Sequence, residues 1–402
     1  MLEKISIVIL LSLLIALNLL KGYVMVTSLA IVLVVFLLMK NKKKNEILLY
    51  VKELKKFFLP IIFLLLIEFI VTGARGFLTG DVVFLLDTIK YSLLFIIVFI
   101  IVINIDEMDI LMKGIALVPL TMIGNIFFEY FVLHIERPGV ATPNLFAWQL
   151  LCVFPFLFLG FRGVNYKAYK NLQLVFAIIW LYALFLTQSR GCILAAIIMG
   201  GLFLGYYWKI GYYWKNGKLS VKNIFLFGLI SLIVVGLNYQ SLVKRIDSSI
   251  NYKNNYTVER IYIWESSWRM FKDNIFTGIG LDSKIFREKY DNVYMLPEAK
   301  EKHIPHSHNN FLYFFVQTGL FGGFAFIFMM CSQIRYFYIQ TKSPRVEIKK
   351  LGEAGVWIVG CTIISQMVDA NFHFISMQKI YWVVLGVVFS CIQLYKKKLF
   401  YK

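Results

Sequence analysis

The sequence has few charged residues and lacks the cysteine and histidine spacings that mark metal sites. Charged residues make up 16% of its 402 residues and hydrophobic residues 59%, whereas soluble proteins carry about a quarter charged residues. This composition excludes a soluble enzyme. The five cysteines show no Cys-x-x-Cys spacing and lie within or at the ends of apolar stretches, so disulfides and a zinc site have little support.

A series of apolar runs takes up most of the chain. A transmembrane helix needs about 20 apolar residues, and about twelve runs come close to that length or exceed it. They lie near residues 5–20, 22–39, 57–73, 84–103, 110–133, 145–161, 172–188, 191–208, 224–239, 308–334, 353–370 and 378–395. The first run lacks a small-residue cleavage site, which predicts a retained helix and not a removed signal peptide. We therefore predict an all-α polytopic membrane protein with about twelve transmembrane helices.

The basic residues lie mainly in alternate connections between these runs. The formal net charge is +19, but nucleic-acid binders carry such charge as a stripe on a polar domain, so we predict no nucleic-acid partner. Short connections after even-numbered runs, such as 40–56 and 335–350, are rich in Lys and Arg, whereas those on the other side hold few. Basic residues in short loops mark the cytoplasmic side, which places both termini in the cytoplasm.

Residues 240–307 form a connection long enough to have a structure of its own. It mixes acidic, basic and aromatic residues, so it is predicted to fold, and its place in the alternation puts it on the external side. The predicted division is therefore transmembrane helices one to nine in residues 1–239, an external domain in 240–307, and helices ten to twelve with a cytoplasmic tail in 308–402.

Within the external segment, residues 259–273 have the spacing of a helix. Four residues recur at intervals that place them on one face: Arg260, Trp264, Ser267 and Phe271. One interpretation is a helix that rests on the membrane surface, with Trp264 and Trp268 as interfacial anchors. Arg260 would still require a partner there.

Four charged or titratable residues occur at predicted external span ends or in the external segment: Arg137, Arg190, Arg260 and His308. Such groups are costly unless they pair or face water, which makes them site candidates. Several guanidinium groups on one side favour an anionic ligand, because Arg forms paired hydrogen bonds with phosphate oxygens. The alternative, strongest for Arg137, is contact with lipid headgroups. For Arg190, a polar turn at 187–191, tightened by Gly191, favours a site.

Two histidines, His306 and His308, precede the tenth run. On a helix, residues two apart point about 200° away from each other, and this motif contains no Asp or Glu, so we predict that no metal binds. If Ser307 caps the helix, the positive helix end faces the same pocket as His308. A neutral His308 could remove a proton from a hydroxyl there. The alternative is a histidine bonded to a loop carbonyl.

Three short motifs follow one another around the external segment. They are Thr-Gln-Ser-Arg-Gly at 187–191, the pair Arg260 and Trp264 leading to Asn-Ile-Phe-Thr-Gly-Ile-Gly at 274–280, and His-Ser-His-Asn-Asn-Phe-Leu at 306–312 with Gln-Thr-Gly-Leu-Phe-Gly at 317–322. In this order they resemble the O-antigen ligase and polymerase superfamily of bacterial envelope glycosyltransferases, over roughly residues 137–330. The resemblance implies a GT-C-like ligase fold in the bacterial inner membrane, with the site facing the periplasm.

The resemblance also implies a chemistry. It is that of a metal-independent, inverting glycosyltransferase without cofactors, whose donor is a glycan on undecaprenyl diphosphate. Arg190 and Arg260 would hold the diphosphate, Arg137 would do so less securely, and His308 would deprotonate the acceptor hydroxyl. Neighbouring positions would support the site, namely Gln188, Trp264, His306 and Asn309.

The acceptor stays open, because the family includes ligases that use the lipid A core, polymerases that extend a lipid-linked glycan, and members that glycosylate proteins. The turn at 187–191 and the chain length favour a ligase. A lipid-linked glycan or anion transporter is an alternative of another class. It would show repeated halves with helices broken near the midplane, whereas the candidate residues here gather at one face. A purely structural membrane protein is the remaining alternative.

Overall fold

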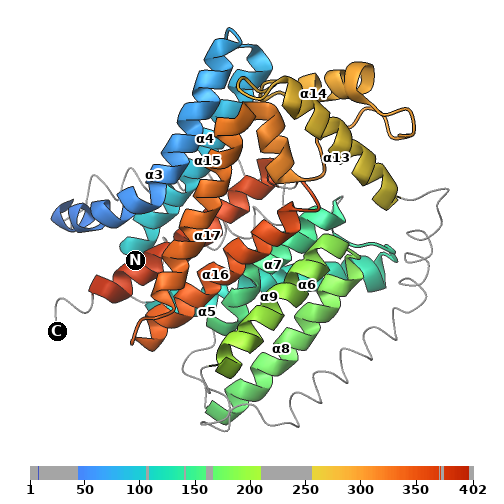
Figure 1. Cartoon of the computed structure of the whole chain (residues 1–402). Coiled ribbons are helices and arrows are strands. Elements are labelled where there is room, and N and C mark those ends of the chain that lie inside the picture. Colours follow the sequence, from blue (N-terminus) through green and yellow to red (C-terminus); the bar gives the residue numbers. More distant parts are fainter. Residues whose placement is uncertain are drawn as a thin grey trace.

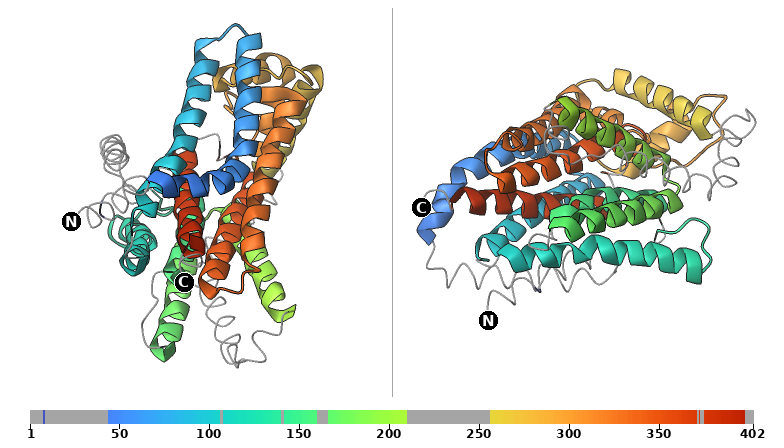
Figure 2. Two further views of the ribbon diagram at one scale, coloured as in Figure 1. Left: turned by 90° about the vertical axis from the view of Figure 1, so that its left-hand side faces the viewer. Right: turned by 90° about the horizontal axis from the view of Figure 1, so that it is seen from below.

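The computed structural model is helical, with no strand in any part of the chain that it describes (Figures 1 and 2). It describes residues 44–105, 108–139, 142–159, 166–209, 256–370 and 375–397, with Val8 and Phe372 as single residues. The predicted all-α class is therefore confirmed. Apart from Val8, the predicted spans at 5–20, 22–39 and 224–239, and residues 240–255 of the external segment, lie outside the described residues. The count of twelve spans stays a prediction.

The described helices follow the predicted runs. Those of the first half are α3 (Lys44–Ala74), α4 (Thr79–Ile103), α5 (Met108–Ile115), α6 (Leu117–Phe127), α7 (Pro143–Leu159), α8 (Tyr166–Leu186) and α9 (Arg190–Lys209). Those of the second half are α13 (Tyr256–Asp273), α14 (Ser283–Lys289), α15 (Asn310–Gln340), α16 (Val346–Gln366) and α17 (Ile375–Lys397). Two single π-helical turns are η1 (Phe128–Val132) and η3 (Tyr290–Tyr294).

Five stretches within the described residues are long and apolar enough to cross a membrane: Tyr50–Ala74, Thr79–Ile103, Ile110–Val132, Asn310–Gln340 and Gln378–Lys397. Shorter apolar stretches lie in α7, α8 and α9. The predicted connection at 40–56 is partly wrong, because α3 begins at Lys44. Its Lys and Glu residues favour helix, and Lys56 pairs with Glu53 one turn away at 2.9 Å.

α17 lies at the centre of the bundle, where it packs along α4 and against α16 and α7 (Figure 1). Protein buries 94% of its apolar stretch, against 44% of the apolar stretch of α3, so α17 is surrounded by helices more than by lipid. Rings from several helices interlock. Phe57 of α3 stacks on Phe95 of α4 with ring centroids 4.9 Å apart and lies 5.2 Å from Phe389 of α17. Close side-chain packing of this kind holds membrane helices together.

The described part of the predicted external segment folds at one end of the bundle, beside the hairpin between α3 and α4 (Figures 1 and 2). It buries an apolar core of its own that includes Ile263 of α13, Phe286 of α14 and Tyr313 of α15. α13 packs against both α15 and η3. Residues 256–307 are therefore folded, whereas their side of the membrane stays a prediction.

α15 is broken at Gly319, where φ is 68° and ψ is −167°. Glycine reaches this conformation because it has no Cβ. In an unbroken helix, the carbonyls of Val316 and Gln317 would accept from the amides four residues later. The break leaves these carbonyls without their helical donors, so they need other partners.

The loop after α13 supplies those partners. Three hydrogen bonds join it to the break: Ile279 N to Val316 O at 2.9 Å, Gly280 N to Gln317 O at 3.0 Å, and Leu320 N to Ile275 O at 2.6 Å. Broken membrane helices persist where other protein groups satisfy the backbone in this way. The motifs at 274–280 and 317–322 are thus paired in space, and the first half of α15 (residues 310–318) is fixed to the end of α13.

Candidate functional site

Arg137 joins the loop after η1 to the turn between α8 and α9. Its Nε donates to the carbonyl of Thr187 at 3.1 Å, and its Nη2 donates to Oδ1 of Asn144. Burial lowers the pKa of this half-buried guanidinium, Asp369 opposes the shift, and Arg190 adds to it. Arg137 and Arg190 therefore share one electrostatic environment, and Arg137 is engaged by protein groups.

Glu129 in η1 fixes the loop that carries Arg137. Its Oε2 accepts from the amide of Gly139 at 2.6 Å, and its Oε1 accepts from the side-chain amide of Asn125 at 3.1 Å. Its carbonyl accepts from the amide of Ile135 at 2.9 Å. A π-helical turn re-aims the side chains around it and is frequent at functional sites. The end of this helix is thus built to hold the Arg137 loop in place.

The turn between α8 and α9 carries Arg190, the first residue of α9, whose side chain is exposed. Its left-handed residue is Gln188, with φ of 53°, and not Gly191 as expected. The Gln188 side chain donates to the carbonyl of Glu136 at 3.0 Å, which ties the turn to the loop after η1. Gly191 has a different role, because a Cβ there would lie 2.7 Å from a methyl group of Val368.

The start of α15 is capped by Asn309 and not by Ser307. The Asn309 Oδ1 accepts from the amide of Leu312 at 3.1 Å, as an N-cap side chain does. Ser307 Oγ donates instead to the carbonyl of Asn309 at 2.6 Å. The predicted cap is therefore wrong by two residues, and the motif at 306–308 precedes the helix.

His306 and His308 consequently lie side by side. The backbone amide of His308 donates to Nδ1 of His306 at 3.3 Å, and the two ring centroids are 4.5 Å apart, edge to face. His308 has a φ of 51°, a conformation that is uncommon for a residue other than glycine and worth notice near a site. The expected divergence of the two rings is wrong, because helical rotation does not apply in this loop.

Asp369, in the loop after α16, faces His308. Its Oδ1 lies 3.6 Å from Nδ1 of His308, just beyond hydrogen-bond distance, and its Oδ2 accepts from the side chain of Asn144 at 3.1 Å. Burial alone would raise the pKa of Asp369, but His308, Arg260 and His306 outweigh it and hold the pKa below its ordinary value. The carboxylate is therefore ionised and in reach of positive charge from two elements.

Asp369 was not predicted from the sequence, although a signal for it exists. It stands at the end of the predicted run 353–370, and a charge at a span end is the feature that selected Arg190. Its partners, Asn144 and His308, are far away in the sequence, so only the fold reveals the grouping.

α13 brings Arg260 to the same region and confirms the predicted helix at 259–273. Phe271, on the predicted face, is buried against α15. Arg260 is half-buried and affects the pKa of Asp369. Trp264 is also half-buried, and its indole N–H has no hydrogen-bond partner among the described residues. Trp268 is 50% exposed, so only the second tryptophan has the exposure expected of a surface anchor.

These side chains form one connected group, which we call the His308 network: Arg137, Asn144, His306, His308 and Asp369. Arg190 and Arg260 lie close enough to affect pKa values within it. Among the residues that the structure describes, no three or more His, Cys, Asp or Glu side chains are arranged to hold a metal ion. Since the argument from diverging histidines is wrong, the metal-free reaction stays a prediction.

Comparison with known families agrees with the resemblance seen in the sequence. Residues 175–327 match the family described as O-antigen ligase. This confirms the likeness to the O-antigen ligase and polymerase superfamily and supports a membrane glycosyltransferase of that type. The match includes Arg190, Arg260 and His308, whereas Arg137 and Asp369 lie outside it. No curated protein matches the chain significantly.

Proposed function

From this likeness to O-antigen ligases, we propose that the chain transfers a glycan en bloc from undecaprenyl diphosphate to the hydroxyl of an acceptor sugar. The observation that carries the proposal is the His308 network, where His308 faces the carboxylate of Asp369, Asp369 interacts electrostatically with Arg260 and Arg137, and Arg190 interacts with Arg137. Histidine suits removal of a proton near neutral pH, and arginines suit a diphosphate. Both are needed at one place for this reaction.

Arg190 and Arg260 bind the diphosphate. Negative charge on the diphosphate grows as its bond to the sugar breaks, so guanidinium groups held nearby stabilise the transition state more than the ground state. Arg137 has a supporting role, because its Nε and Nη2 already bind protein groups. It joins the turn that precedes Arg190 to Asn144 at the start of α7.

His308 is the base. Its Nδ1 faces Asp369 at 3.6 Å, which leaves Nε2 for the acceptor hydroxyl. The hydroxyl oxygen attacks the anomeric carbon while its proton passes to His308. The bond from that carbon to the diphosphate oxygen breaks, and undecaprenyl diphosphate leaves with the electron pair. Attack opposite the leaving group inverts the anomeric configuration. Asp369, being ionised, stabilises the imidazolium that forms.

Purified protein tests this proposal with a glycan on undecaprenyl diphosphate and a core oligosaccharide as acceptor. We expect one undecaprenyl diphosphate released for each glycan transferred, and unchanged transfer in EDTA. Wild-type protein that transfers no glycan to any acceptor supplied would overturn the proposal. A transporter would instead move the lipid-linked glycan across vesicles without releasing diphosphate. Activity lost in EDTA and restored by a divalent ion would refute the metal-free mechanism alone.

We propose lipid A core as the acceptor, because the matching family is described as O-antigen ligase. A polymerase, which extends a lipid-linked glycan, is the second candidate. Deletion of the gene separates them. Loss of a ligase leaves long glycans on undecaprenyl diphosphate and unsubstituted core, whereas loss of a polymerase leaves core that carries a single repeat. A gel that shows the second pattern rejects the ligase.

The proposed site faces the periplasm of a bacterial inner membrane, because the sequence places the basic connections, such as 40–56 and 335–350, on the opposite side of the alternation. Single cysteines in a cysteine-free background test this in intact cells. Val293 in η3 is 69% exposed and Val346 at the start of α16 is 58% exposed, so both accept reagents. An impermeant maleimide should label Val293→Cys and spare Val346→Cys. The reverse pattern contradicts the orientation.

A further inference from the structure

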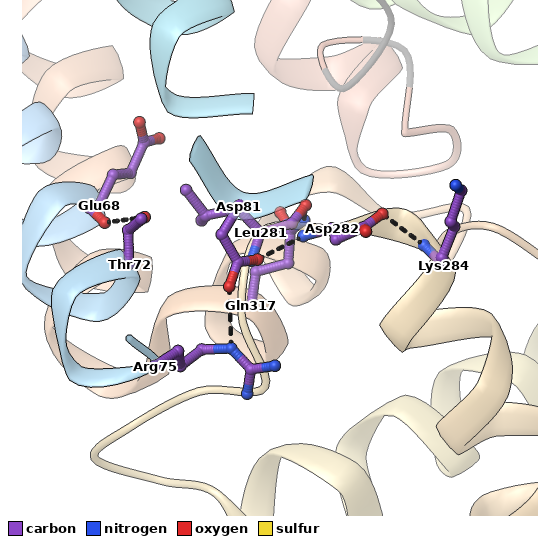
Figure 3. A network of polar contacts seen from close by, with 8 residues as sticks. All are labelled: Glu68, Thr72, Arg75, Asp81, Leu281, Asp282, Lys284 and Gln317. Atoms are coloured by element: carbon purple, nitrogen blue, oxygen red, sulfur yellow. Dashed lines mark hydrogen bonds and ion pairs between the residues drawn. The ribbon is translucent and has the colours of Figure 1, made fainter. Parts of the chain in front are cut away.

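A second polar network joins the hairpin between α3 and α4 to the segment after α13 (Figure 3). Asp81, in the first turn of α4, is fully buried. Its Oδ2 accepts from Nε of Arg75 at 2.9 Å, and its Oδ1 accepts from the amides of Leu281 at 2.6 Å and Asp282 at 2.9 Å. Gln317 of α15 donates to the carbonyl of Leu281 at 2.6 Å. We call these five residues the Asp81 network.

Asp81 is fully engaged in this arrangement. A buried carboxylate is tolerated when it is paired and its oxygens are hydrogen-bonded, and here both oxygens have donors. Arg75 supplies the opposite charge, with its side chain 25% exposed. Removal of either group would leave the other without its main partner, so the two act together.

The segment that Asp81 holds is the one that fills the break in α15. The amides of Ile279 and Gly280 bind α15 carbonyls, and the next two amides in the chain bind Asp81. Residues 274–282 are thus clamped between the hairpin and α15. α13, which carries Arg260, leads directly into this segment. The first half of α15 (residues 310–318), which follows His308, is hydrogen-bonded to it. Arg75 and Asp81 lie outside the matched residues 175–327.

We propose that Asp81, acting with Arg75, is a positioning residue of the transfer site. It holds residues 274–282 in the break of α15 and thereby fixes His308 and Arg260 relative to the rest of the bundle. The inference rests on the proposed function, because the effect on catalysis is read from glycan transfer. A displacement of about 1 Å of a catalytic group can lower a rate about a hundredfold.

Amide substitutions of Asp81 and Arg75, made singly and together, test the contact between the two side chains. In Asp81→Asn, the amide oxygen can still accept from residues 281 and 282, but the amide nitrogen then meets Nε of Arg75, donor against donor. In Arg75→Gln, the amide nitrogen is the same number of bonds from Cα as Nε of the arginine, so it can donate to Asp81. The double variant D81N/R75Q pairs an amide nitrogen with an amide oxygen, which restores the contact without charge.

Two measurements are made in detergent on wild type, D81N, R75Q and D81N/R75Q. One gives kcat and KM for the lipid-linked glycan, and the other gives hydrogen exchange of peptides that cover residues 276–284. We expect D81N to lower kcat about a hundredfold, to change KM less, and to speed exchange in those peptides. R75Q, which keeps a donor to Asp81 but removes the charge, should lose less than D81N, and D81N/R75Q should stay within severalfold of wild type. The matched control is Asp87→Asn on the same helix, because Asp87 pairs with the exposed Lys90 and not with residues 274–282. It should leave both readouts unchanged.

Each outcome either supports or contradicts the positioning role of Asp81. Loss in D81N with recovery in the double variant supports the proposal, and if D81N does not insert, recovery in the double variant still supports it. Wild-type kcat in D81N, no recovery in the double variant, or faster exchange without loss of kcat each overturns the positioning role. If wild-type protein transfers no glycan, the positioning role falls together with the proposed function, while hydrogen exchange still shows whether Asp81 holds the segment.

Discussion

Asp81 and Asp369 are two carboxylates with different surroundings. Asp81 is fully buried and accepts from two backbone amides and an arginine. Asp369, with its side chain 13% exposed, accepts from Asn144 and faces His308 across a gap longer than a hydrogen bond. A carboxylate whose partners are all fixed stabilises a fold, whereas one that faces a titratable ring can support proton transfer. The difference separates a scaffold from a reacting centre within one bundle.

The largest loss of glycan transfer is expected when the proposed base is removed. His308→Ala should lower glycan transfer about a thousandfold, since general-base catalysis contributes factors of that order. The side chain is 27% exposed in a loop, so its removal should leave insertion and thermal unfolding near those of wild type. Transfer rates on purified protein measure the loss. Full transfer by this variant would place His308 among merely structural residues and leave the mechanism without a base.

Asp369→Asn should have the next largest effect. The amide cannot stabilise an imidazolium as the carboxylate does, and loss of such a supporting partner typically lowers activity about tenfold to a hundredfold. The Asn144 contact can be kept through the amide oxygen. Measurement of kcat for wild type and variant tests this. A variant that keeps wild-type kcat would show that Asp369 does not support proton transfer at His308.

The ionisation state of Asp369 sharpens the comparison. The pKa of Asp369 lies below its ordinary value of 3.8, so the group is ionised throughout the range from about pH 5 to pH 8. A lowered folded pKa contributes stability above the unfolded pKa and loses it as pH falls through the folded one. The infrared difference between wild type and Asp369→Asn should therefore show an ionised carboxylate at every pH from about 5 to 8. A protonated carboxyl band within this range contradicts the assignment.

Arg137→Lys should act on stability more than on chemistry. A lysine cannot bind Thr187 and Asn144 at once, as Nε and Nη2 of the arginine do. Loss of one charged hydrogen bond destabilises by about 2 kcal/mol, which a lower Tm would report, with only a few-fold loss of transfer. Unchanged Tm together with a large rise in KM for the donor would instead make Arg137 a ligand of the diphosphate.

The smallest effect is expected on the far face of α13. Arg269 pairs with Glu265 one turn away, and both side chains are about half exposed. Such pairs contribute about 0.5 kcal/mol or less, so Arg269→Ala should keep wild-type transfer and Tm. This variant is the matched control for Arg260 on the same helix. A loss as large as that of Arg260→Ala would show that charge on α13 matters in general and not one position.

The helices could be predicted from the sequence because their signals are local. Long apolar runs define α4 and α15, and a regular spacing around Arg260 predicts α13. The break at Gly319 could not be predicted, since it lies inside an apolar run and depends on hydrogen bonds from residues 275–280. The helical spacing assumed for His306 and His308 was wrong for the same reason, because α15 begins only at Asn310, two residues after His308.

The candidate site was predicted in part. Its arginines and His308 stand at predicted span ends or in the external segment, where a charged group must pair or face water, and the structure brings them to one region. Asp369 and Asp81 were missed because their partners come from distant parts of the chain, at Asn144 and Leu281 respectively. Such pairings depend on how helices pack, which residue spacing within one segment does not encode.

The central claim is that the arginines bind the diphosphate while His308 performs the chemistry. Binding of undecaprenyl diphosphate to purified wild type, Arg190→Lys, Arg260→Lys and His308→Ala in one detergent tests it most directly. The account predicts that His308→Ala binds like wild type, whereas each arginine variant binds about tenfold more weakly, since lysine cannot form paired contacts to phosphate. Wild-type affinity in both arginine variants, or lost binding in His308→Ala, would contradict it.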